Sequence, residues 1–176
     1  DNFDSMAWVA QKIRIPLATG ERIHTPQEYQ MLVKRQALDY LRVSICVCGG
    51  FTGAKKIAAI AEANQIGIIP HNPLSPVATA ACIQFDAATP SFTIQEYPDP
   101  DGPAAHARFV FEKTGKSAFR ASDIVNVMPE CRDGFLVVPD APGIGIELVE
   151  GVEEKFPFER RKVVTRLTTD GAVMDQ

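Results

Sequence analysis

Residues 2–95 alternate between helical periodicity and short apolar or β-branched runs, and this alternation limits the possible folds more than any other feature of the chain. It predicts helices over 2–12, 26–37, 53–63 and 75–88, and strands over 13–18, 40–46, 66–70 and 91–95. Such strict alternation predicts parallel strands joined by right-handed crossovers. An open doubly wound sheet and a closed (β/α)8 barrel both fit the pattern, although no G-x-G-x-x-G turn supports dinucleotide binding.

Three ionisable residues stand at or just beyond the carboxyl ends of predicted strands. Glu21 follows the first strand, His71 the third and Glu96 the fourth. In both α/β architectures the carboxyl ends of the strands carry the chemistry. We therefore expect these three side chains to converge on one rim of the sheet.

The chain changes character after Glu96. A cluster of prolines predicts a loop, and residues 104–113 have the pattern of a short helix. Further on, 135–138 and 144–149 are of extended type and flank a turn rich in Pro and Gly. We therefore divide the chain into a repetitive part and an irregular part, 1–97 and 98–176.

The composition argues against several classes of protein. The 176 residues carry a net charge of −4, which argues against a nucleic-acid partner. No run approaches the ~20 apolar residues of a membrane span, so we expect no membrane association. Four cysteines are too few for a disulfide framework at this length, and Cys46 and Cys48 lack the second pair or histidine of a zinc site. We expect reduced, buried cysteines and a cytoplasmic protein.

Four motifs occur in the order and at the spacing of one enzyme family. They are Ala18-Thr19-Gly20-Glu21-Arg22, Gly49-Gly50 with Lys55-Lys56-Ile57-Ala58, Pro70-His71-Asn72-Pro73-Leu74-Ser75-Pro76, and Ile94-Gln95-Glu96-Tyr97. Together they resemble the carboxyl-terminal half of acid-sugar dehydratases of the enolase (mandelate racemase) superfamily, the galactonate dehydratases most of all. Residues 139–149 resemble the carboxyl-terminal return of the same enzymes.

The resemblance implies an α/β fold: the last four strands and helices of a TIM-type (β/α)7β barrel in 1–97, then a return segment in 98–176 that packs on a capping domain. It also implies a Mg²⁺ held by three carboxylates on successive strand ends, with Glu21 as the third. By position, His71 would be the catalytic acid or base. Glu96 would be a catalytic carboxylate that hydrogen-bonds the substrate. Arg42, which matches a substrate-binding arginine of mannonate dehydratases, would contact the substrate together with Glu21 and Ser44.

The implied reaction is the Mg²⁺-dependent dehydration of an aldonate such as D-galactonate. Removal of the proton α to a carboxylate leaves charge on its oxygens, which a hard divalent cation with oxygen ligands stabilises. Loss of the β-hydroxyl as water then gives a 2-keto-3-deoxy acid. The partners would be a small-molecule sugar acid and further copies of the same chain in a homo-oligomer.

Two departures from the family pattern leave alternatives open. Galactonate dehydratases place an aspartate beside the histidine where this chain has Ser44, which can orient His71 but cannot stabilise its charged form. Mannonate dehydratases also lack that aspartate, so a mannonate dehydratase or a racemase of the same superfamily is one alternative. The first two metal carboxylates, the first barrel half and the capping domain would precede Asp1. A non-catalytic, truncated or degenerate barrel half is therefore a second alternative.

Overall fold

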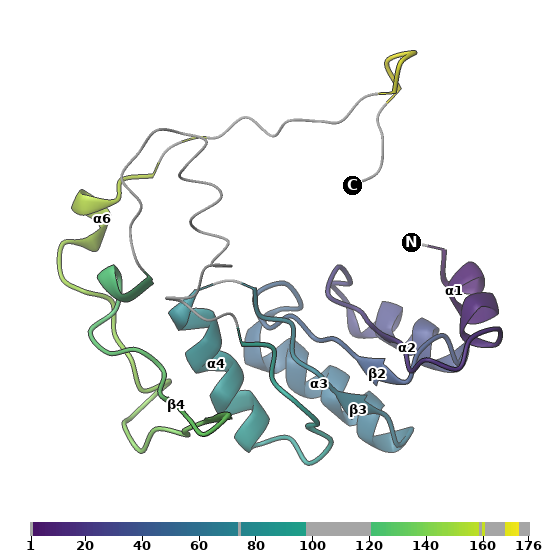
Figure 1. Ribbon diagram of the computed structural model, residues 1–176, viewed down its shortest axis with the longest axis horizontal. Coiled ribbons are helices and arrows are strands. Elements are labelled where there is room, and N and C mark those ends of the chain that lie inside the picture. The colour runs from purple at the N-terminus through teal and green to yellow at the C-terminus, as the bar shows by residue number, and fades with distance from the viewer. Residues whose placement is uncertain (1, 74, 98–120, 159, 161–167, 173–176) are drawn as a thin grey trace.

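The structure is a computed structural model that describes residues 2–73, 75–97, 121–158, 160 and 168–172. Helices and strands alternate through residues 2–97, which confirms the predicted order (Figure 1). The elements are α1 (Phe3–Ala10), β1 (Ala18–Thr19), α2 (Pro26–Lys34), β2 (Tyr40–Leu41), α3 (Gly50–Ala63), β3 (Gly67–Ile68) and α4 (Pro76–Ala87).

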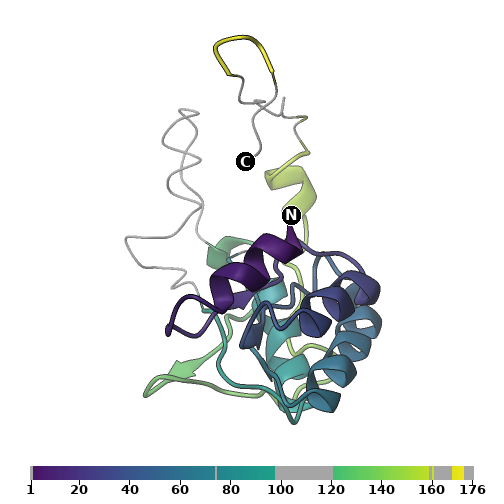
Figure 2. The ribbon, with the colours of Figure 1, turned by 90° about the vertical axis from the view of Figure 1, so that its right-hand side faces the viewer.

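The three strands form a parallel sheet in sequence order, β1-β2-β3. A parallel bridge between Ile68 and Phe92 continues this order with the fourth predicted segment. The helices α2, α3 and α4 lie side by side along the sheet (Figures 1 and 2). A doubly wound sheet reverses its strand order, whereas a barrel keeps it. The arrangement is therefore part of a TIM-type barrel.

Side-chain caps fix where the helices begin. The hydroxyl oxygen of Thr25 accepts a hydrogen bond from the backbone N–H of Glu28, and the carboxylate of Glu28 accepts one from the backbone N–H of Thr25. Pro26 then occupies the first turn of α2, where its missing N–H costs nothing. The hydroxyl oxygen of Ser75 caps α4 by accepting from the backbone N–H of Ala78, and Pro76 again occupies the first turn.

The core lies between these helices and the sheet. α2 turns Tyr29, Leu32 and Val33 inward at helical spacing, and they pack with Leu41 of β2 and Ile68 of β3. Burial of one such side chain contributes about 1.5–3 kcal/mol relative to exposure. Packing of the helices against the sheet is therefore what holds the short strands together.

The paired strands are much shorter than the sequence predicts. Residues 13–17 precede β1 unpaired, and Ile13 and Ile15 are exposed. The backbone oxygen of Leu17 accepts from the N–H groups of both Asp39 and Tyr40, and the bond from Tyr40 is the first of the ladder that pairs Ala18 with Tyr40. The fourth predicted strand, 91–95, contributes the single bridge at Phe92.

Cys46 and Cys48 lie in a turn, although the sequence predicted a strand that continues through Cys46. The N–H groups of Val47 and Cys48 both donate to the backbone oxygen of Ser44, which closes a turn over 45–49. Gly49 then takes a left-handed conformation (φ 93°), and α3 begins at Gly50, three residues earlier than predicted. The sequence predicted four buried cysteines, but only Cys48 and Cys82 are buried, whereas Cys46 and Cys131 are exposed.

The carboxyl-terminal part contains a small hairpin of β4 (Cys131–Arg132) and β5 (Phe135–Leu136) and a short helix, α6 (Val152–Lys155). The predicted extended segments 135–138 and 144–149 pair with upstream residues: Leu136 with Cys131, and Leu148 with Val125. The helix predicted over 104–113 lies outside the described residues. In the described part of the chain, no helix is long and apolar enough to cross a membrane.

Candidate active site

The predicted site residues lie at one end of the sheet. Glu21 and Arg42 come just after β1 and β2, and His71 follows β3. Glu96 comes after the bridge at Phe92. Successive parallel strands end at the same edge, so this placement agrees with the rim that the sequence predicts.

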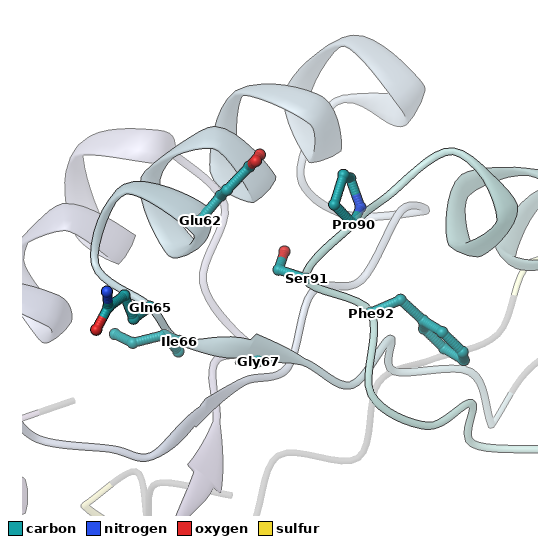
Figure 3. A pocket seen from close by; sticks show the side chains of 7 residues that line it. All are labelled: Glu62, Gln65, Ile66, Gly67, Pro90, Ser91 and Phe92. Carbon is teal, nitrogen blue, oxygen red and sulfur yellow. The ribbon is translucent and has the colours of Figure 1, made fainter.

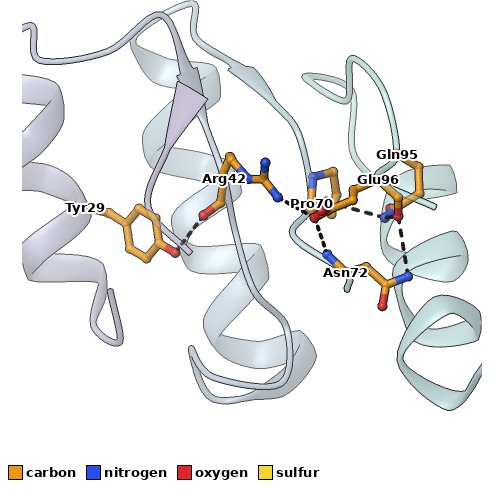
Figure 4. Close-up of polar contacts among 6 residues, drawn as sticks. All are labelled: Tyr29, Arg42, Pro70, Asn72, Gln95 and Glu96. Carbon is orange, nitrogen blue, oxygen red and sulfur yellow. Dashed lines mark hydrogen bonds and ion pairs between the residues drawn. The ribbon is translucent and has the colours of Figure 1, made fainter. Parts of the chain in front are cut away.

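A network of polar contacts joins three of these strand ends (Figure 4). The guanidinium of Arg42 forms an ion pair with the carboxylate of Glu96 through Oε2. The backbone N–H of Asn72 donates to the same oxygen at 2.8 Å. The side-chain amide of Gln95 donates to the backbone oxygen of Glu96 at 2.7 Å. The second carboxylate oxygen of Glu96, Oε1, has no hydrogen-bond partner among the described residues.

Asn72 and Gln95 are the residues of this network that were not predicted as site residues, and Asn72 connects the network to α4. Its side chain is fully buried, and its Nδ2 donates to the hydroxyl of Thr79 in α4 at 2.8 Å. This contact fixes the loop after β3, so that the backbone N–H of Asn72 faces Glu96. The sequence feature that could have indicated a site role for Asn72 is its position between His71 and Pro73 in one of the four motifs.

His71 is half-buried and lies in the loop that follows β3. Its backbone N–H donates to the oxygen of Val43 at 2.9 Å, and its ring nitrogen Nδ1 is buried with no partner in the described structure. Burial lowers the pKa of His71 below its ordinary value; the charge of Glu96 opposes this shift and that of Arg42 adds to it. The imidazole is therefore neutral near pH 7, the form that can accept a proton.

Ser44 is buried at the end of the segment that follows β2, with a side-chain oxygen that also has no partner among the described residues. The sequence suggested that Ser44 could orient His71. No hydrogen bond joins the two side chains, although the backbone contact from His71 to Val43 keeps their segments together. The segments that follow β2 and β3 thus hold a buried hydroxyl and a buried ring nitrogen, neither with a partner among the described residues.

Glu21 is half-buried and makes no hydrogen bond or ion pair with another described residue. An oxygen ligand without a competing partner suits a hard cation such as Mg²⁺. Within the described ranges, however, no group of three or more His, Cys, Asp or Glu side chains could hold a metal ion. If a metal ion binds at this edge, the described residues would offer it the single carboxylate of Glu21, and its other ligands would come from outside these ranges.

A shallow pocket of about 330 Å³ lies at the opposite end of β3 (Figure 3). Its walls come from the end of α3, the start of β3 and the turn before Phe92: Glu62, Gln65, Ile66, Gly67, Pro90, Ser91 and Phe92. None of the predicted site residues lines this pocket. The polar network at the carboxyl ends of the strands is therefore the better candidate for an active site.

A parallel α/β arc with ionisable side chains at the carboxyl ends of its strands has the arrangement of TIM-barrel enzymes. The family model described as Enolase C-terminal domain-like matches residues 1–152. The chain belongs to this family, within the enolase and mandelate racemase superfamily.

Individual relatives agree with this assignment. A D-galactonate dehydratase family member from Streptomyces bingchenggensis is 33% identical over 99% of the chain and 39% of its own length. The D-mannonate dehydratase CC0532 of Caulobacter vibrioides is 30% identical over 95% of the chain and 38% of its own length. An enolase from Agrobacterium radiobacter, bound to sodium and L-malate, superposes with a TM-score of 0.78 and 29% identity over 98% of the chain and 43% of its own. The chain thus spans about two fifths of the curated relatives it matches.

Proposed function

We propose that this chain supplies the acid–base side of the active site of a Mg²⁺-dependent acid-sugar dehydratase acting on an aldonate such as D-galactonate. The observation that carries the proposal is the network of Arg42, Asn72 and Glu96 around a half-buried His71 whose pKa is lowered. The reaction removes the proton α to the carboxylate and eliminates the β-hydroxyl as water, which yields a 2-keto-3-deoxy acid.

Glu21 would be one oxygen ligand of the Mg²⁺, at the end of β1. Its carboxylate is free of other described partners, and it stands on the same edge as the network. When bound, Mg²⁺ supplies positive charge at the substrate carboxylate, where negative charge develops as the α-proton leaves. As a ligand next to that carboxylate, Glu21 would also help to place the substrate.

His71 would transfer a proton through Nε2, because Nδ1 is buried. In its neutral form it can take the α-proton, and once protonated it can give a proton to the departing hydroxyl. Ser44 would contribute its hydroxyl to substrate binding, because its side-chain oxygen has no partner among the described residues.

Arg42 and Glu96 would bind the substrate's polar groups. Glu96 already accepts two hydrogen bonds at Oε2, so its Oε1 is available to a substrate hydroxyl. Arg42 keeps its remaining guanidinium N–H groups for an anionic substrate, and its buried Nε has no partner in the described part of the chain. A charged pair at the rim thus suits a sugar acid, which carries both a carboxylate and hydroxyls.

The setting of the reaction completes the proposal. We place the enzyme in the cytoplasm, where free cysteines stay reduced, as a homo-oligomer without nucleic-acid or membrane partners. Residues 1–97 would form one half of the barrel, and 98–176 the segment that returns to a capping domain. The names of the relatives, D-galactonate and D-mannonate dehydratases, support the substrate class.

Two rivals have observations in their favour. Ser44 in place of an aspartate and the presence of Arg42 favour a mannonate dehydratase, and a racemase of the superfamily would use the same rim. The single described carboxylate ligand favours a non-catalytic barrel half.

A product assay separates these possibilities. The full protein is incubated with Mg²⁺ and a panel of aldonates, and 2-keto-3-deoxy acids and epimers are measured by chromatography. We expect a keto-deoxy acid that depends on Mg²⁺. A product from mannonate alone would favour the first rival, and an epimer without dehydration would indicate a racemase. No turnover, with no rise in melting temperature at millimolar Mg²⁺, would indicate the non-catalytic form.

A further inference from the structure

Tyr29 of α2 lies against the backbone of two strand ends and takes no part in the polar network itself. Its side chain is fully buried. The phenolic O–H donates to the backbone oxygen of Gly20 at 2.7 Å. It also lies 3.2 Å from the backbone oxygen of Arg42, a contact that Figure 4 shows. One hydroxyl hydrogen is thus shared between the ends of β1 and β2.

The backbone oxygens of Gly20 and Arg42 accept few other hydrogen bonds. The ladder between β1 and β2 ends with the N–H of Arg42 donating to Thr19 at 2.8 Å. The oxygen of Gly20 also accepts from Ile23 at 3.0 Å, but among the described residues only Tyr29 donates to the oxygen of Arg42. Beyond the ladder, the hydroxyl therefore replaces the next rung between the two strands.

Burial keeps Tyr29 a donor. It raises the pKa of Tyr29 well above its ordinary value near 10. The phenol therefore stays protonated over the whole range in which an enzyme works.

Both strand ends carry residues of the proposed site. Gly20 immediately precedes Glu21, and its Cα packs so closely on Arg42 that a Cβ would lie 2.8 Å from the Arg42 oxygen and 2.8 Å from Tyr29 Cε1. Arg42 in turn holds Glu96. We infer that Tyr29 is a positioning residue, which sets the spacing between Glu21 and the Arg42–Glu96 pair through the backbone of the two strand ends. This inference rests on the proposed function.

The test compares Tyr29→Phe with Tyr40→Phe in the full protein. Tyr40 lies on β2, half-buried, and its hydroxyl makes no hydrogen bond with the described residues, so its variant controls for the loss of a phenolic oxygen. For a residue that orients metal and substrate ligands, we expect about a 10-fold loss in Mg²⁺ affinity or kcat in Tyr29→Phe. The control should match the wild type in both.

A purely structural role would give a different result. Tyr29→Phe would then melt at a lower temperature, while the Mg²⁺ affinity and kcat of the folded protein stayed at wild-type values, and the inference would be wrong.

Backbone hydrogen exchange separates this inference from the proposed function. If the wild type neither binds Mg²⁺ nor turns over an aldonate, the proposed function fails, but exchange still reports on the strand ends. We expect the amides of 20–23 and 42–44 to exchange at least several-fold faster in Tyr29→Phe only. Unchanged exchange in these segments would overturn the inference whether or not the enzyme is active.

Discussion

The guanidinium of Arg42 forms an ion pair with the carboxylate of Glu96, 54 positions further along the chain. The backbone N–H of Asn72 donates to the same carboxylate oxygen at 2.8 Å. This one oxygen therefore joins the end of β2, the loop after β3 and the segment beyond Phe92. The contact connects fold and site, because the residues that would bind substrate also hold the strand ends together.

Loss of Arg42 should destabilise the fold. Arg42→Gln removes one partner of a pair whose side chains are only 25% and 33% exposed, so we expect about 1–3 kcal/mol less stability in urea unfolding. Arg132→Gln is the control, because it breaks an exposed pair with Glu130, which should change stability by less than about 1 kcal/mol. Equal effects of the two variants would contradict the structural role of the network.

Two buried hydroxyls should respond in opposite directions to removal. The oxygen of Ser44 has no partner in the described structure, so Ser44→Ala should leave stability unchanged or raise it by about 1 kcal/mol. Thr79 bonds both Asn72 and the backbone oxygen of Ser75, so Thr79→Ala should lower stability by roughly 1–2 kcal/mol. Thermal unfolding measures both. A clear loss in Ser44→Ala would mean that its hydroxyl has a partner.

The conformation and packing of Gly20 predict a large effect of a single methyl group. Gly20 has φ 131° and contacts Arg42 so closely that a Cβ would lie 2.8 Å from its oxygen. Gly20→Ala should therefore cost at least about 2 kcal/mol. Gly134→Ala separates the two causes, because Gly134 also has a positive φ (82°) but nothing within 4 Å of the added Cβ. If Gly134→Ala is as destabilising as Gly20→Ala, the close approach of the strand ends plays no part.

Asp86 on α4 should make stability depend on pH. Burial raises the pKa of Asp86 from 3.8 to about 7, and its Oδ1 has no partner in the described structure. Between these values the folded state keeps a proton that the unfolded state releases, so its contribution falls as the pH rises from 4 to 7. Asp86→Asn should be more stable than the wild type at pH 8, by roughly 2–4 kcal/mol, and near the wild type at pH 4. Urea unfolding at the two pH values checks this, with the exposed Asp140→Asn as control; a gain that is equal at both would contradict it.

The sequence predicts the order of elements well because that order follows from periodicity and caps. Apolar residues at helical spacing placed α2 and α4, and Pro26 and Pro76 marked their starts. The predicted strand lengths were wrong because a residue joins a strand only where a neighbouring strand pairs with it. The ladder of β1 starts only where Tyr40 lies opposite Ala18, and nothing local to Ile13 or Ile15 signals that these two residues stay exposed.

The candidate site was predicted as separate residues, and the contacts between them were not. The position of Glu21, His71 and Glu96 after successive strands indicated a common edge. The ion pair from Arg42 to Glu96 and the donor role of Asn72 depend on how loops fold back over the strands. The turn hydrogen bonds at Ser44, which place Cys46 and Cys48 outside the sheet, also involve backbone atoms whose partners the side chains do not specify.

The most direct test of the account is the rate of 2-keto-3-deoxy acid formation by Glu21→Gln, measured in the full protein at saturating Mg²⁺ against wild type and Glu62→Gln. Glu62 is an exposed carboxylate at the opposite end of the sheet, so its variant controls for the loss of one negative charge. Because Glu21 would ligate the metal, we expect Glu21→Gln to lose at least about 100-fold in rate and Glu62→Gln to match the wild type. Full activity in a folded Glu21→Gln would contradict a Mg²⁺ site at the end of β1.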